Sequence, residues 1–220
     1  MSGRVLTVNL AAVAEPNPAK GVGRTGIGKR PVESAVLRAP GPKHGGLGSG
    51  LVGDVVSDVA HHGGDRQAVY AYAREELDAW QVRLGRTLPN GMFGENLTTV
   101  DRDVDGALIG ERWAVGDEVV LEVCGPRVPC ATFAYRMGLP GWLKSFTEVG
   151  KSGAYLSVET GGTVRPGDPI RVLDRPEHGI DVALTFRAFM GDLDAARAAI
   201  AGNCLPEDEV EWLQDWINRR

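Results

Sequence analysis

Short runs of alternating apolar and polar residues, separated by glycine and proline, dominate this sequence. The chain holds 30 glycines and 13 prolines, so its periodic segments are brief and end at tight turns. Three runs follow a Gly-Asp pair, at Gly53-Asp54, Gly116-Asp117 and Gly167-Asp168. Glycine supplies positive φ and aspartate caps a turn, so each pair predicts the corner where a strand starts. Repeated corners favour a mainly β chain folded as a barrel or closed sandwich.

Several segments predict particular strands and one helix. The clearest strands are Arg4–Leu10, Glu118–Cys124 and Ala154–Val158. In the second of these, alternate apolar residues share one face, and Cys124 on the other face suits a packing role. A stripe of Leu77, Trp80 and Leu84 predicts a single helix over Ala73–Leu84, which we expect to cover an open end of the barrel.

The pattern changes after Leu173. A linker is expected over residues 174–179, and three short helices should follow, with Asp181 and Asp192 as N-caps and Pro206 near the third start. A segment of roughly 40 residues makes a weak core alone, so it should dock on the barrel or on a partner. We predict a barrel domain over residues 1–175 and a three-helix subdomain over residues 176–220.

Composition narrows the classes of function. With 220 residues the chain buries a core without disulfides, and its three cysteines form no disulfide framework. The first residues show no signal segment, so a cytoplasmic location is expected. No apolar stretch approaches the ~20 residues that span a bilayer, which argues against a membrane role. A net charge of −5 defines no nucleic-acid surface, so we expect a small-molecule partner.

The pentapeptide Pro126-Arg127-Val128-Pro129-Cys130 carries the strongest chemical signal. Its prolines stiffen a loop at the end of a strand, and such a loop can aim a thiol. Arg127 can favour the thiolate, which is the form that attacks or binds metal. The alternative for Cys130 is a buried cysteine that acts only as a small apolar side chain.

Three further motifs combine polar side chains with glycine. In His61-His62-Gly63-Gly64 we expect His62 to face a pocket, with a backbone-bonded turn histidine as the alternative. In Gly94-Glu95-Asn96-Leu97-Thr98, the side chains of Asn96 and Thr98 share one side of an extended strand, as a pocket wall would. The glycine-rich loop Gly26–Val32 carries Lys29 and Arg30, and we expect it to be either a cradle for an anion or a solvated surface loop.

The sequence gives little support to two other roles for the cysteines, a structural zinc site and a thiol hydrolase. Structural zinc requires four ligands, and Cys124 and Cys130 lack a second pair at a typical spacing. A thiol hydrolase that uses Cys130 with His62 has no further support in the sequence.

Four motifs together resemble the MOSC family, which is named for the C-terminal domain of molybdenum cofactor sulfurase. They are Gly28–Val32, His62–Tyr70, Gly94–Thr99 and Pro126–Cys130. Their order and spacing resemble the stand-alone bacterial YiiM-like branch over about Val5 to Leu173. The helical tail resembles the three-helix domain of that branch.

This resemblance implies a MOSC β-barrel of largely antiparallel strands that binds the molybdenum cofactor, with Cys130 as the protein ligand to molybdenum. By the same resemblance, the pterin and phosphate pocket would be lined by Lys29, His62, Asn96, Thr98 and Arg127. A catalytic proton would come from His62 or Glu95.

The resemblance also implies an activity. Relatives of this branch reduce N-hydroxylated compounds such as hydroxylaminopurines and amidoximes, with electrons from a separate flavoprotein reductase. The chain shows no flavin or NAD motif, so neither is expected to be bound. An alternative is a sulfur carrier or cofactor-handling protein with a persulfide on Cys130, although no pyridoxal-phosphate domain fits in the chain. A third is a scaffold that only binds an anion or a partner. Either a monomer or a homodimer agrees with the sequence.

Overall fold

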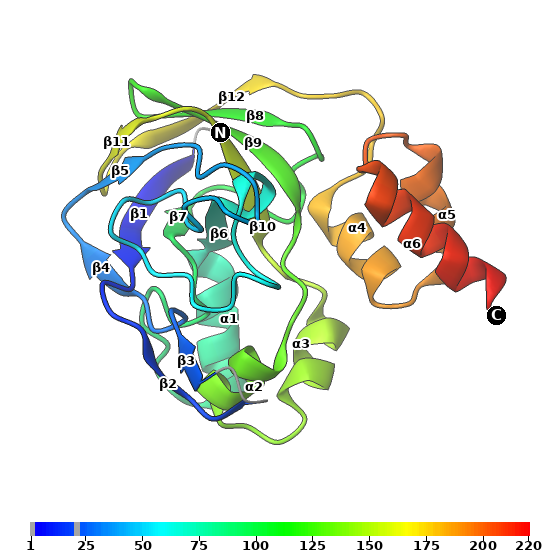
Figure 1. Ribbon diagram of the computed structural model, residues 1–220, viewed down its shortest axis with the longest axis horizontal. Coiled ribbons are helices and arrows are strands. Elements are labelled where there is room, and N and C mark those ends of the chain that lie inside the picture. The colour runs from blue at the N-terminus through cyan, green and yellow to red at the C-terminus, as the bar shows by residue number, and fades with distance from the viewer. Residues whose placement is uncertain (1–2, 20–22) are drawn as a thin grey trace.

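A closed β-barrel is the main feature of the computed structural model, which describes residues 3–19 and 23–220 (Figure 1). The strands are β1 (Gly3–Leu10), β2 (Glu15–Asn17), β3 (Gly23–Thr25), β4 (Arg30–Val32), β5 (Ala35–Leu37), β6 (Val69–Ala73), β7 (Leu97–Val100), β8 (Arg112–Val115), β9 (Val119–Pro126), β10 (Ala154–Thr160), β11 (Gly162–Val164) and β12 (Pro169–Asp174). The helices are α1 (Arg74–Leu84), α2 (Ala131–Met137), α3 (Trp142–Val149), α4 (Val182–Phe189), α5 (Leu193–Ala201) and α6 (Glu207–Asn218).

One sheet forms the barrel wall, in the order β12-β8-β9-β10-β6-β7-β1-β4. An additional pairing between β12 and β1 closes it, with Gly3 opposite Ile170 and Arg4 opposite Pro169. In this sheet β6 and β7 run parallel because α1 and a loop connect them as a crossover, and the other pairs are antiparallel. The predicted barrel of largely antiparallel strands is therefore confirmed.

Two of the three predicted Gly-Asp corners start a strand. Gly116-Asp117 precedes β9 and Gly167-Asp168 precedes β12, and both glycines have positive φ. The prediction for Gly53-Asp54 was wrong, because residues 55–56 form no strand. The side chain of Asp54 instead turns inward and accepts a hydrogen bond from the backbone N–H of Ala11 at 2.8 Å, far along the chain.

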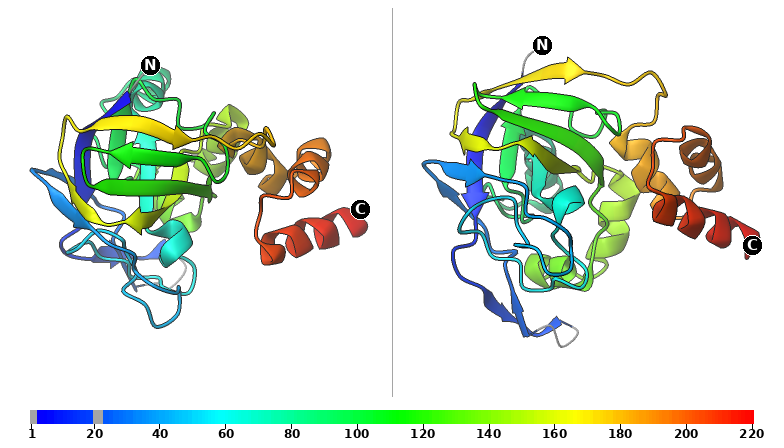
Figure 2. Two further views of the ribbon diagram at one scale, coloured as in Figure 1. Left: turned by 90° about the horizontal axis from the view of Figure 1, so that it is seen from above. Right: turned by 45° about the horizontal axis from the view of Figure 1, so that its top comes forward.

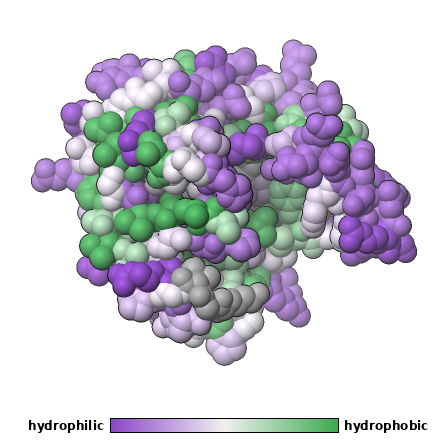
Figure 3. Space-filling model, viewed as in Figure 1, coloured by the Kyte–Doolittle hydropathy of each residue, from purple (hydrophilic) through white to green (hydrophobic). Residues whose placement is uncertain are grey.

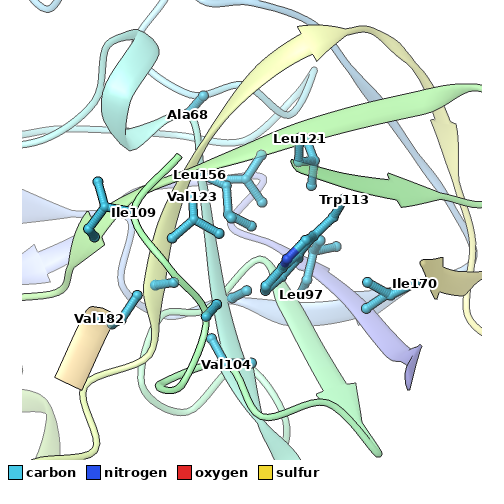
Figure 4. Close-up of a cluster of buried hydrophobic side chains, with 14 of the residues drawn as sticks. Ala68, Leu97, Val104, Ile109, Trp113, Leu121, Val123, Leu156, Ile170 and Val182 are labelled. Atoms are coloured by element: carbon cyan, nitrogen blue, oxygen red, sulfur yellow. The ribbon is translucent and has the colours of Figure 1, made fainter. Parts of the chain in front are cut away.

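The interior of the barrel is apolar and densely filled. Figure 4 shows side chains from different strands gathered around one centre, among them Leu97, Trp113 and Ile170. The alternating residues of β9 that were predicted to share a face are all buried, and Cys124 on the same strand is buried too. Burial of one face of each strand holds the register, since a one-residue slip would expose that face.

A second cluster of buried residues lies where α1, α2 and α3 gather at one end of the barrel (Figure 1). Phe93 is its centre, with ring centroids of Phe133 and Tyr72 at 5.0 Å and of Trp142 at 5.7 Å. The predicted covering helix is present as α1. The expectation that it alone interrupts the strands was wrong, because α2 and α3 lie between β9 and β10.

The C-terminal segment forms the three predicted helices, which lie together at one side of the barrel in both views of Figure 2. Asp181 and Asp192 cap α4 and α5 as expected. Backbone hydrogen bonds join the segment to the barrel, from Ile109 N to Ile180 O and from Val182 N to Ala107 O, both at 3.0 Å. The boundary between residues 175 and 176 stays a prediction. No helix in the described ranges is long and apolar enough to span a bilayer.

Candidate active site

A pocket lies beside the loop that joins β9 to α2. Of the seven predicted site residues, its walls include Lys29, His62, Asn96, Arg127 and Cys130. The pocket and its open mouth together span about 710 Å³, which includes solvent at the mouth. Motifs that lie up to a hundred residues apart in the sequence thus meet in one place.

Cys130 occupies the N-cap position of α2, directly after the two-proline loop. Burial by itself raises the pKa of its thiol, but His62, the Arg127 cation and the backbone N–H of Phe133 outweigh burial and lower the pKa to about 6. Cys130 is therefore mainly thiolate at neutral pH, a soft ligand and a nucleophile. By contrast, burial raises the pKa of Cys124.

Arg127 is a buried cation without a carboxylate partner among the described ion pairs. Its side chain is almost fully enclosed, and its guanidinium carbon lies 3.9 Å from the ring centroid of Phe133 and 5.6 Å from that of Tyr70. The Nη1 atom is buried and makes no hydrogen bond to any described residue. A buried charge with an unused donor is costly unless an anion satisfies it, so this pocket suits an anionic ligand.

Lys29 is placed differently from Arg127, because its charge is already paired. Its Nζ contacts both carboxylate oxygens of Asp54. Asp54 also accepts hydrogen bonds from Ser49 Oγ at 2.8 Å and Asn96 Nδ2 at 3.0 Å. Asn96 in turn accepts from the backbone N–H of Tyr70 at 3.1 Å. These contacts make a rigid polar wall in which Lys29 and Asn96 are largely satisfied by protein groups.

The two adjacent histidines face different surroundings. His62 lines the pocket, whereas the His61 side chain is 76% exposed and its Nδ1 lies 3.0 Å from Asp58 Oδ1. The glycines that follow allow close backbone packing, and Gly63 also lines the pocket. A Cβ on Gly63 would meet Gly48 O at 2.7 Å and one on Gly64 would meet the backbone of Lys43 at 2.7 Å, and both have positive φ.

Glu95 and Thr98 lie behind the pocket, outside its lining. The Glu95 carboxylate accepts from Gly91 N at 2.5 Å, Phe93 N at 3.0 Å and Thr98 Oγ1 at 2.9 Å. Thr98 also accepts from Asn9 Nδ2 at 3.0 Å. Burial raises the pKa of Glu95. These contacts give Glu95 a role in shaping the loop at Gly91–Gly94, and they argue against the expected direct proton transfer and direct cofactor contact by this pair.

Several lining residues were not anticipated from the sequence. Asp54 was interpreted only as a turn residue, although it holds the polar wall. Tyr70 and Tyr155 were not assigned, yet both line the pocket near Arg127. Burial raises the pKa of Tyr70 well above its usual value, so its hydroxyl remains a donor, here to Ser152 O at 2.7 Å. The position of Tyr70 at the end of the His62 motif was the one available signal.

Protein side chains alone do not assemble a metal site here. Within residues 3–19 and 23–220, no group of three or more histidine, cysteine, aspartate or glutamate residues is placed to hold a metal ion. The pocket instead presents one thiolate, one unpaired cation and one imidazole. This donor set fits an anionic ligand that carries its own metal and takes one further bond from the protein.

The fold and this pocket agree with the sequence comparisons. Residues 58–171 match the family described as "MOSC domain". YflK of Bacillus subtilis, described as an uncharacterized protein, is 35% identical over 163 residues, which cover 74% of this chain and 70% of YflK. The chain therefore belongs to the MOSC domain family.

Other similar proteins carry more specific names. YiiM of Escherichia coli is 29% identical over 135 residues, 57% of each chain. A protein of Gibberella moniliformis named "Reductase" is 33% identical over 132 residues, which make up 23% of that longer protein. The crystal structure of YiiM from Geobacillus stearothermophilus superposes with a TM-score of 0.74 at 23% identity, covering 98% of this chain and 99% of that one. This structural likeness establishes the shared fold, including the C-terminal helices.

Proposed function

We propose that this chain binds the molybdenum cofactor in the Cys130 pocket and reduces N-hydroxylated compounds, with electrons from a separate flavoprotein reductase. The observation that carries the proposal is the Cys130 thiolate beside the unpaired Arg127 cation in one pocket. Membership of the MOSC family and the relative named "Reductase" support an oxidoreductase of this kind.

The residues of the pocket fit the cofactor. Cys130 would be the protein ligand to molybdenum, and the free Nη1 of Arg127 would donate to an anionic oxygen of the cofactor. Lys29 is neutralised by Asp54, so we assign it to the order of the pocket wall and not to charge compensation. When bound, the cofactor supplies a centre that exchanges two electrons.

The overall reaction consumes two electrons and two protons, and it converts an N-hydroxylated compound into the corresponding N–H compound and water. The N–O bond breaks, and the departing oxygen must gain protons. His62 borders both the pocket and its mouth, and the ring nitrogens of an imidazole can pass a proton to the departing oxygen. We assign proton delivery to His62 in preference to the enclosed Glu95.

The test is metal content combined with activity. The chain is purified from a host that makes the cofactor, and molybdenum is measured by mass spectrometry beside reduction of benzamidoxime with a flavoprotein reductase. Both should be lost in Cys130→Ser and kept in Cys204→Ser, since Cys204 lies outside the pocket. The absence of molybdenum and of Cys130-dependent reduction in the unmodified chain would defeat the proposal. Thiol-labile sulfur on Cys130 would instead favour the sulfur carrier.

A further inference from the structure

A second recess lies between the barrel and the C-terminal helices and meets the Cys130 pocket at its mouth. The residues that line both are Asp58, His62, Gln67, Cys130, Thr132 and Tyr155. Figure 3 shows the hollow between the barrel and the helical segment, with apolar surface inside it. A molecule whose reacting atom lies at Cys130 can therefore extend into this recess.

One wall of the recess is aromatic and comes from the C-terminal helices. Trp212 of α6 is 50% exposed, and its ring lies 5.9 Å from that of Phe189 of α4 in an edge-to-face arrangement. Met190, which directly follows α4, and Leu143, which lies in α3, add apolar surface. A half-exposed indole held by a second ring leaves a flat face for a planar molecule.

The same helix brings negative charge to the recess. Glu209 and Asp208 both line it, one turn before Trp212. The Oε2 atom of Glu209 is buried without a hydrogen-bond partner among the described residues, and its Oε1 forms an ion pair with Arg66 Nη2 at 3.8 Å, which is too far for a hydrogen bond. Among the described residues that line the recess there is no lysine or arginine. A carboxylate that is held only by a long ion pair to Arg66 and has one oxygen without a hydrogen bond to a described residue favours a ligand that donates N–H bonds or carries positive charge.

We propose that this recess binds the non-reacting part of the substrate and selects planar compounds with a cationic or N–H-donating group over anionic ones. Trp212 stacks on the planar group and Glu209 accepts its N–H. The inference rests on the proposed function for the reaction at Cys130, but binding in the recess requires neither cofactor nor electron donor.

Two planar probes of similar shape and opposite charge test the proposal. Benzamidine and benzoate are titrated calorimetrically into the cofactor-free full chain, and we expect benzamidine to bind about tenfold more tightly or better. Glu209→Gln and Trp212→Leu should each weaken benzamidine binding by about tenfold. Glu211→Gln is the matched control, because Glu211 is an exposed acid on the same helix outside the recess.

The outcomes separate this inference from the proposed function. Three results overturn the inference, even where N-reduction at Cys130 is found. Benzamidine binding is undetectable, it is no tighter than benzoate binding, or it is unchanged in the Glu209 and Trp212 variants. Discrimination that depends on these two residues supports it, even where no molybdenum is bound. Circular dichroism checks each variant, and both side chains are partly exposed, so their replacement leaves no closed cavity.

Discussion

Lys29 and Asp54 form a buried two-contact ion pair in the wall of the Cys130 pocket. Lys29 Nζ lies 2.6 Å from Oδ1 and 2.5 Å from Oδ2 of Asp54, and the side chains are 8% and 1% exposed. Burial lowers the pKa of Lys29, and the Asp54 carboxylate opposes that change. With its further bonds to Ala11 N, Ser49 and Asn96, Asp54 ties together segments that are remote in the sequence.

Removal of the Asp54 charge should destabilise the protein strongly. Asp54→Asn leaves the Lys29 ammonium buried and unpaired, so the free energy of unfolding in urea should fall by about 3–5 kcal/mol. The double variant Lys29→Met with Asp54→Asn should recover part of this loss, because no buried charge remains. Equal stability of the single variant and the wild type would contradict the buried pair.

The Cys130 thiol should titrate far below an ordinary cysteine. Alkylation by iodoacetamide, followed by mass spectrometry of the Cys130 peptide, should reach half its maximal rate at about pH 6, where thiol gives way to thiolate. His62→Ala should move this midpoint upward, since His62 favours the thiolate. Cys204 is the internal control, because burial raises its pKa. The same alkylation midpoint for Cys130 and Cys204 would refute the prediction.

The unpaired Arg127 should make anion binding measurable as stabilisation. Pyrophosphate at 100 times its Kd should add about 2.7 kcal/mol, which raises the Tm of a chain of this size by roughly 5–10 °C. Arg127→Met should remove this response. Arg30→Met, which changes an exposed arginine of β4, should keep it. An undiminished shift in Arg127→Met would show that the anion binds elsewhere.

The contribution of Asp105 to stability should fall as pH rises, whereas most carboxylates contribute more at higher pH. It is 1% exposed, and its Oδ1 accepts the N–H groups of Ser152 at 2.7 Å and Gly153 at 3.1 Å. Burial raises its pKa from 3.8 to about 6, so the folded state binds this proton more tightly than the unfolded state. Its contribution to stability is therefore full below pH 3.8 and is lost as pH rises to about 6.

Asp105→Asn should then be more stable than the wild type above pH 6, by up to about 3 kcal/mol, with the difference vanishing near pH 4. Urea unfolding at pH 4, 5 and 7 measures this difference. Asp117→Asn, in an exposed turn, is the control for the loss of a surface carboxylate. A difference that is constant with pH would mean that the pKa of Asp105 is the same in the folded and the unfolded protein, and it would refute the raised pKa.

Local patterns predicted the barrel because a strand with one buried face has apolar residues at every second position of the sequence. In β9 every second residue from Val119 to Val123 is buried, and the alternation is visible without a structure. Helix caps are equally local, as Asp181 and Asp192 show. The short helices α2 and α3 were missed, although Gly138, which has positive φ, ends α2 and Gly150 ends α3 in the same way.

The pocket was only partly predictable, since its polar wall depends on contacts between distant segments. Arg127 stood out because it lies between two prolines, and Cys130 because it directly follows the second. The sequence around Asp54 does not indicate that its hydrogen-bond partners include Ala11 and Asn96, which lie 43 and 42 residues away. The catalytic role of Glu95 was implied by the family resemblance, and only the positions of the backbone N–H groups around it show what its carboxylate binds.

The closure of the barrel between β1 and β12 has a consequence for how the protein is made. Gly3 pairs with Ile170, so the first strand waits for its partner until nearly the whole barrel has been translated. At ribosomal rates that interval is roughly ten seconds or more. During it the Gly3–Arg4 end of β1 lacks its partner on that edge, although β4 can already pair with Val8–Leu10, and this unpaired end exposes the nascent chain to aggregation and to chaperones. A ribosome stall before β12 should therefore be far more harmful than one within the C-terminal helices.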